Sequence, residues 1–186
     1  MTVLGVVLAG GASTRMGATD KVLAELGGET LLARAVARLA PQVDAVVVNG
    51  PEALCARCDV PVVPDTIEGR AGPLAGLLAA MKASDADAFV TVAVDTPFFP
   101  PDLAARLSGE TVGIARADGR LQPVFGRWPR AAEEPLASFL AKGDRKIMTL
   151  AGQLGYRAVD FAEPDAFFNI NVPANLERAR AMLEET

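Results

Sequence analysis

Short apolar runs alternate along the chain with segments whose apolar residues recur at helical spacing. The runs are rich in Val, Leu and Phe and are bounded by Gly, Pro, Asn or Asp, a pattern that predicts buried strands. The predicted strands cover residues 3–8, 45–48, 60–63, 89–94, 112–117, 121–125 and 156–161. Helical spacing, in several cases after a proline, predicts helices over residues 30–39, 51–57, 102–107, 131–141, 147–152 and 173–183, and a further helix that begins at Pro73.

This alternation of strands and helices is typical of a mostly parallel sheet that is covered by helices on both faces. The dipeptide Asp118-Gly119 separates two of the strands and predicts a hairpin, which adds an antiparallel pair. The chain contains no linker, low-complexity tract or internal repeat. We therefore expect a single domain over residues 1–186 with an α/β fold, namely a Rossmann-like three-layer α/β/α sandwich.

Polar or glycine positions follow several of the predicted parallel strands. The segment 8–11 (LAGG) ends in a double glycine, and Asn49, Asp65 and Asp95 each follow a later strand. In open sheets of this kind, ligands bind outside the carboxyl ends of the strands. A single aspartate after a strand is ordinarily a turn or cap residue, so the prediction depends on the agreement of these positions. We expect them to meet at one edge of the sheet.

Composition removes several kinds of chemistry. The 186 residues carry a formal net charge of −5, which argues against a nucleic-acid-binding surface. The chain contains no histidine, which excludes His-ligated zinc and catalytic triads with a histidine base. A metal site would have to consist of oxygen ligands, and such a site favours Mg²⁺ or a similar hard ion.

The two cysteines, Cys55 and Cys58, form a CxxC motif. Such a motif can be a redox pair, but without a second pair or a histidine it cannot complete a zinc site. We expect reduced thiols, as is usual in a cytoplasmic protein. The N-terminal apolar run is too short to span a membrane and lacks a basic segment before it, so we expect a cytoplasmic protein that binds no membrane.

The most informative segment runs from the first predicted strand to Lys21. Its double glycine leaves backbone N–H groups bare, and such a turn can cradle an anion. Arg15 and Lys21 add two positive charges, and phosphate favours fixed N–H donors combined with mobile cations. Glycines after a first strand are common, and Arg15 could equally be a solvated surface residue. The loop is neither a Walker A loop, which needs GKS or GKT, nor the GxGxxG loop of dinucleotide-binding folds.

Two further segments carry candidate ligands for a metal or a phosphate. Asp95 follows an uncharged apolar run, so its carboxylate could hold a hard metal ion, or it could cap the next segment. Asn169 and Asn171 alternate with apolar residues, so in an extended segment both amides face the same way. They could bind a hydrated metal or a substrate phosphate, whereas Asn171 alone could cap the helix that begins at Pro173.

The run LAGGASTRMGATDK, residues 8–21, resembles the nucleotide-binding signature of the small nucleoside-triphosphate transferases. With LAGG and a chain of this length, it resembles the molybdenum cofactor guanylyltransferase family in particular. The VDTP segment at residues 94–97, the GPLAG within Gly69 to Gly76, and FFNINVPANL at residues 167–176 resemble further motifs of that family. The last segment departs from the family pattern where Val172 replaces the usual threonine and two acidic positions are lost.

The resemblance implies transfer of GMP from GTP to the terminal phosphate of molybdopterin or its molybdenum-loaded form, with release of pyrophosphate. It implies that Arg15, Lys21 and Asp95 are the catalytic residues, that Asp95 also holds Mg²⁺, and that Arg145 and Lys146 lie near the acceptor. Nucleotide and metal binding would also involve the glycine loop, the strand ends and the two amides. These residues are Leu8, Ala9, Gly10, Gly11, Asn49, Asp65, Asn169 and Asn171.

Other functions stay open at this point. Molybdopterin cytidylyltransferases usually carry LAAG, and Gly10 leaves more room for a purine. Sugar-phosphate guanylyltransferases carry LAGG but are generally longer. A nucleotide-binding regulatory module without catalysis would not need Arg15, Lys21 and Asp95 together. The expected partners are GTP and molybdopterin, and we expect a monomer with only transient contacts to proteins that deliver or receive the cofactor.

Overall fold

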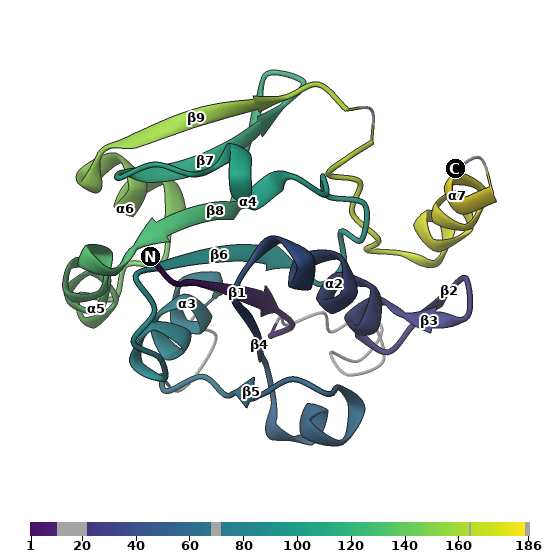
Figure 1. Cartoon of the computed structure of the whole chain (residues 1–186), viewed down its shortest axis with the longest axis horizontal. Helices are drawn as coiled ribbons and strands as arrows, with labels where there is room; N and C mark the ends of the chain where they lie inside the picture. Colours follow the sequence, from purple (N-terminus) through teal and green to yellow (C-terminus); the bar gives the residue numbers. More distant parts are fainter. Residues whose placement is uncertain (11–21, 68–71, 164, 185–186) are drawn as a thin grey trace.

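The alternating elements fold around one mixed sheet. The computed structural model describes residues 1–10, 22–67, 72–163 and 165–184 (Figure 1). The strands of the sheet lie in the order β5 (Val62–Val63), β4 (Ala45–Asn49), β1 (Val3–Leu8), β6 (Ala88–Ala93), β8 (Arg120–Pro129), β7 (Val112–Ala117) and β9 (Tyr156–Phe161). Within this sheet β8 runs antiparallel to both neighbours, and the other neighbouring pairs are parallel. The predicted mostly parallel sheet with an added antiparallel pair is confirmed.

Helices cover both faces of this sheet. The helices α2 (Leu31–Leu39) and α4 (Leu103–Arg106) pack on one face, and α3 (Pro73–Lys82), α5 (Glu133–Ala141) and α6 (Ile147–Leu154) pack on the other (Figure 1). Alternate residues of β1 enter the two layers: Val6 and Leu8 pack with α3, whereas Val7 packs with α2. All three are buried. This arrangement confirms the three-layer sandwich.

A smaller apolar cluster lies beyond the carboxyl ends of the parallel strands. It joins the hairpin of β2 (Glu25–Leu26) and β3 (Glu29–Thr30) to the last helix, α7 (Pro173–Glu184) (Figure 1). Its buried residues are Leu26, Leu31, Ile170 and Ala179. The dipeptide Gly27-Gly28 indicates a turn here, but the sequence pattern did not predict the hairpin, because strands of two residues leave almost no periodicity to detect.

The strand β8 differs most from its prediction. The pattern predicted a strand that ends at Phe125, since Gly126 interrupts the apolar run. The strand instead continues to Pro129 and buries Trp128 in the core. A glycine inside a strand often marks a bulge, and a bulge is what the interruption reflects here.

The bulge lies just before Gly126, the point from which β8 pairs with both β6 and β7. Along β7, pairing passes from Gly126 directly to Gln122, so residues 123–125 leave the ladder. The Thr91 hydroxyl of β6 donates to the carbonyl oxygen of Val124 (2.6 Å) and thereby holds the bulge in place. The buried hydroxyl thus satisfies a carbonyl that the ladder cannot.

Short 3-10 helices complete the described fold: η1 (Ala40–Gln42), η2 (Glu52–Arg57) and η3 (Arg130–Ala132). The helix predicted from Pro51 is η2, and it adopts the tighter 3-10 form. The strand predicted over residues 60–63 is shorter, because only Val62 and Val63 pair with β4. Among the described helices, none has the length and apolar character needed to cross a bilayer.

Candidate functional site

The carboxyl ends of β1 and β4 are joined by backbone hydrogen bonds. Leu8, the last residue of β1, is beside Asn49 in the strand register. The Ala9 N–H donates to the Asn49 carbonyl oxygen (2.8 Å), so the pairing continues past the end of β1. Leu8 and Ala9 are buried and Gly10 is exposed. The glycine loop therefore leaves the sheet directly beside Asn49.

The end of β6 lies on the other side of β1. Leu8 pairs with Ala93, and the Val94 N–H donates to the Leu8 carbonyl oxygen (3.2 Å). Asp95 follows at once and is half-buried. The structure therefore brings residues 8–10, Asn49 and Asp95 to one edge of the sheet, where the sequence predicted them.

Asn49 is also linked to the end of β5. Its side chain is almost completely buried, with 2% of the residue exposed. The side-chain Nδ2 donates to the carbonyl oxygen of Val63 (3.1 Å) and to Oδ1 of Asp65 (2.9 Å). Both amide hydrogens are thus used within the protein, and the polar atom that Asn49 can still offer a ligand is the acceptor Oδ1.

Gly10 lies against the acceptor atoms of this pair. A Cβ atom at Gly10 would lie 3.4 Å from Asn49 Oδ1 and 4.0 Å from Asp65 Oδ2. A side chain at this position would therefore stand directly in front of both oxygens. Because Gly10 has no side chain, it places no Cβ atom against these two oxygens.

The loop after Asp95 is held by an arginine that sequence reasoning missed. The Thr96 hydroxyl donates to Asp95 Oδ1 (3.3 Å). Arg38 of α2 donates through Nε to the carbonyl oxygen of Phe99 and through Nη2 to that of Phe98 (3.4 Å). Partial burial lowers the pKa of the Arg38 guanidinium from its ordinary value. The apolar face of α2 predicted its packing but offered no signal for this contact.

Residues 165–172, which we call the strap, return from β9 to the site. The Ile170 N–H donates to the carbonyl oxygen of Asp95 (2.8 Å), and this bond fixes the strap beside the end of β6. Asn169 and Asn171 flank Ile170, and the Asn175 amide donates to the Asn169 carbonyl oxygen (2.8 Å). The structure thus brings the predicted amides to the segment that contacts Asp95.

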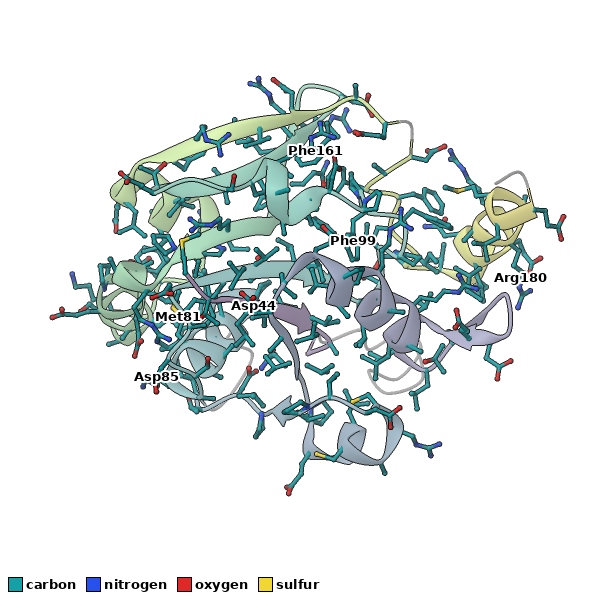
Figure 2. All side chains as sticks on the ribbon, in the orientation of Figure 1. Asp44, Met81, Asp85, Phe99, Phe161 and Arg180 are labelled. Atoms are coloured by element: carbon teal, nitrogen blue, oxygen red, sulfur yellow. The ribbon has the colours of Figure 1, made fainter. Side chains whose placement is uncertain are left out.

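Aromatic packing anchors the strap to the sheet. Phe167 makes edge contacts with Phe125 of the β8 bulge (4.9 Å between ring centroids) and with Phe161 of β9 (5.6 Å). Phe125 in turn lies 6.1 Å from Phe99, in the loop that Arg38 holds. Figure 2 labels Phe99 and Phe161, the two ends of this aromatic row.

The strap also contains an unsatisfied polar atom. Among the described residues, none donates a hydrogen bond to the buried Asn169 Oδ1. Buried acceptors are nearly always paired, so an orphaned oxygen on the residue before Ile170, whose N–H bonds to Asp95, fits a cation or a ligand N–H. Within the described ranges, no group of three or more Cys, Asp or Glu side chains could hold a metal alone. A divalent ion would therefore need Asp95 together with amide, water or substrate oxygens.

The remaining predicted site residues either lie outside the described residues or lie near the start of α6. Gly11, Arg15 and Lys21 lie outside the described residues. Arg145 donates through Nη1 to the carbonyl oxygen of Leu140 (2.8 Å), at the end of α5, whereas Lys146 is exposed at the start of α6.

The cysteines are both free thiols. Cys55 is exposed, and the Cys58 thiol lies 3.4 Å from the Leu54 carbonyl oxygen.

Comparison with known proteins identifies the family. Residues 5–158 match the family model of the MobA-like NTP transferase domain. The chain belongs to this family, and it is a nucleotidyltransferase. It is 44% identical to a molybdenum cofactor guanylyltransferase of Cereibacter sphaeroides, and the match covers 100% of this chain and 99% of that protein.

Solved structures show the same fold at low sequence identity. Molybdopterin-guanine dinucleotide biosynthesis protein A from Archaeoglobus fulgidus is 24% identical, with a TM-score of 0.78 over 99% of this chain and 100% of that one. A Mycobacterium tuberculosis protein solved in complex with manganese is 18% identical, with a TM-score of 0.73 over 97% of this chain and 99% of that one. The predicted Rossmann-like class is thus confirmed.

Proposed function

We propose that this chain transfers GMP from GTP to the terminal phosphate of molybdopterin or its molybdenum-loaded form, with release of pyrophosphate. Full-length similarity to molybdenum cofactor guanylyltransferases supports this assignment. The structural observation that carries the choice of nucleotide is the pair of acceptors, Asn49 Oδ1 and Asp65 Oδ2, beside Gly10.

These acceptors suit the base of GTP. Guanine presents two adjacent donors, N1–H and the 2-amino group, whereas the corresponding edge of cytosine presents one donor and two acceptors. Asn49 cannot reverse its amide without losing its bonds to Val63 and Asp65, so it keeps its acceptor toward the ligand. Cytosine would then place acceptors against acceptors. The site therefore favours guanine by both attraction and repulsion.

The reaction needs charge compensation more than it needs a base. The attacking oxygen belongs to a phosphate that is already anionic, which agrees with a chain that contains no histidine. In this proposal the backbone at residues 8–11 holds the nucleotide, while Arg15 and Lys21 offset charge on the phosphates as pyrophosphate leaves. Asp95, with Asn169 and Asn171 on the strap, would hold a divalent ion such as Mg²⁺. Such an ion would supply charge compensation for the triphosphate as pyrophosphate leaves.

The acceptor would approach from the α6 side. Arg145 already donates to carbonyl oxygens of Leu140 and Asp144, so its guanidinium is engaged in holding the end of α5. Lys146 is exposed at the first turn of α6, where the helix N-terminus adds partial positive charge. We assign the contact with the acceptor phosphate to Lys146 in preference to Arg145.

The nucleotide assignment is tested by thermal shift with GTP, CTP, UTP and ATP, each with Mg²⁺. A ligand that binds only the native state raises Tm, so GTP should give the largest shift at equal concentration. A CTP shift as large as that of GTP would contradict the guanine assignment. Pyrophosphate release from GTP in the presence of molybdopterin then separates an enzyme from a binding module, since a module would bind GTP without releasing pyrophosphate.

A further inference from the structure

Gly76 interrupts an apolar helix at the point where that helix meets Asn49. Gly76 is a buried residue in the first half of α3, whose other buried positions are mainly leucine and alanine. A glycine inside a helix costs about 1 kcal/mol relative to alanine, and its φ is not positive here, so helix geometry does not require it. The reason for a glycine must lie in what a side chain would contact.

A side chain at position 76 would collide with the Asn49 amide. A Cβ atom there would lie 2.1 Å from Asn49 Oδ1 and 2.5 Å from its Cγ, and 2.8 Å from Cδ2 of Leu8. The first two distances are far below van der Waals contact. Asn49 cannot move aside freely, because it is buried and its Nδ2 is bound to Val63 and Asp65.

The side-chain Oδ1 of Asn49 therefore lies in a slot between two glycines. Gly10 lies on one side of this oxygen, where a Cβ atom at Gly10 would be 3.4 Å from Oδ1. Gly76 of α3 lies on the other side. Gly10 is exposed whereas Gly76 is buried within α3, so in this inference a ligand approaches from the Gly10 side. The slot keeps the amide in the one orientation that directs its acceptor to a ligand.

We infer that Gly76 is a positioning residue for base recognition: its missing side chain fixes the Asn49 amide so that Oδ1 accepts from the base. This inference rests on the proposed function and names a residue that acts through Asn49 without contacting the nucleotide. It predicts that Gly76→Ala displaces Oδ1 and breaks the bond from Nδ2 to Asp65. Selectivity for guanine should then fall more than turnover does.

The experiment compares Gly76→Ala with Gly152→Ala. Gly152 lies in α6, and a Cβ atom there would meet nothing within 4 Å, so this control adds the same methyl group to a helix without a collision. The readouts are Tm, kcat, KM for GTP, and the ratio of kcat/KM for GTP to that for inosine triphosphate, which lacks the 2-amino group. Gly76→Ala should raise KM about tenfold and reduce the GTP preference, with a smaller change in kcat. Gly152→Ala should match the wild type.

A second background shows whether the effect passes through Asn49. In Asn49→Ala the colliding amide is gone, so adding Gly76→Ala should cause no further loss of GTP affinity, and any loss of Tm seen in the single variant should be largely recovered. An unchanged GTP preference in Gly76→Ala, equal losses for both nucleotides, or additive losses in the double variant would overturn the inference. If the wild type itself shows no preference for GTP over CTP, the proposed function fails instead.

Discussion

The two halves of the site are built in different ways. The edge formed by β1, β4 and β6 is held by the backbone. Strand pairing continues past Leu8 through Ala9 and Val94, Asn49 ends β4, and Asp95 lies two residues beyond β6. The strap is held mainly by side chains from distant parts of the sequence. The rings of Phe125 and Phe161 pack against Phe167, and a backbone hydrogen bond from Ile170 to Asp95 joins the strap to the edge.

This difference indicates at which residues a substitution can change turnover without changing the stability of the fold. A side chain at the end of a parallel strand can change without disturbing the ladder that positions it, because the ladder uses only backbone groups. A side chain that anchors the strap cannot change in this way, because its own packing contacts hold Asn169 and Asn171 in position. We therefore expect substitution of the half-buried Asp95 at the edge to affect turnover alone, and substitutions in the anchor to affect turnover and stability together.

The largest effect is expected for Asp95→Asn. The change removes the negative charge but preserves the backbone carbonyl that accepts from Ile170. Loss of a group that stabilises charge in the transition state costs on the order of a hundredfold or more in kcat. Tm should change little. Steady-state kinetics over a range of Mg²⁺ concentrations, together with a thermal melt, measure both.

Asp102→Asn is the matched control for that experiment. Asp102 is exposed in the same connection and lies 3.7 Å from Arg106 in a surface salt bridge, so its loss should leave kcat unchanged. Near-normal turnover in Asp95→Asn at saturating Mg²⁺ would reassign Asp95 to a structural role. A large loss of Tm would contradict the separation of chemistry from stability at this edge.

The contrast between the halves also explains what the sequence could predict. Each parallel strand is a local apolar run that ends in a glycine or a polar residue, so its position and the convergence of Asn49 and Asp95 followed from local pattern. The contacts made by Arg38 and the row of phenylalanines join residues far apart in the chain. The spacing of residues within one segment carries no signal for such contacts. The prediction for β8 ended at Phe125, because the bulge and Gly126 interrupt the apolar run before the second half of the strand.

A smaller effect, on both stability and turnover, is expected for Phe167→Ala. Removing a core phenylalanine costs about 3–5 kcal/mol, and Phe167 is only half-buried, so we expect a loss of about 2 kcal/mol. We also expect kcat to fall about tenfold, because the strap loses its anchor beside Asp95. Chemical denaturation and steady-state kinetics provide the two measurements.

Two variants sharpen this result. Phe167→Leu keeps most of the apolar volume and should recover most of the stability and activity. Tyr156→Ala removes an exposed ring from the opposite end of β9 and should change neither. A Phe167→Ala protein that loses stability but retains full kcat would show that the strap amides are dispensable for turnover.

The smallest effect concerns an exposed ion pair near the start of the strap. Arg116 of β7 donates through Nε and Nη2 to the two carboxylate oxygens of Asp160 in β9, each at 2.5 Å. These hydrogen bonds, and then the guanidinium charge, lower the pKa of Asp160 below its ordinary value of 3.8. The folded chain therefore binds this proton less readily than the unfolded chain, and the ion pair stabilises the fold only where Asp160 is ionised.

The sign of the pH dependence follows directly. The contribution of Asp160 is complete well above pH 3.8 and is lost as the pH falls through that value toward the lower pKa of the folded state. Asp160→Asn should thus lower Tm slightly at neutral pH, and the Tm difference from wild type should shrink in acid and at high salt. Asp59→Asn is the control, because exposed Asp59 forms no salt bridge with any described residue. A Tm difference that persists unchanged in acid would mean that Asp160 stabilises the β7–β9 edge through packing, so the pairing of these strands would not depend on charge.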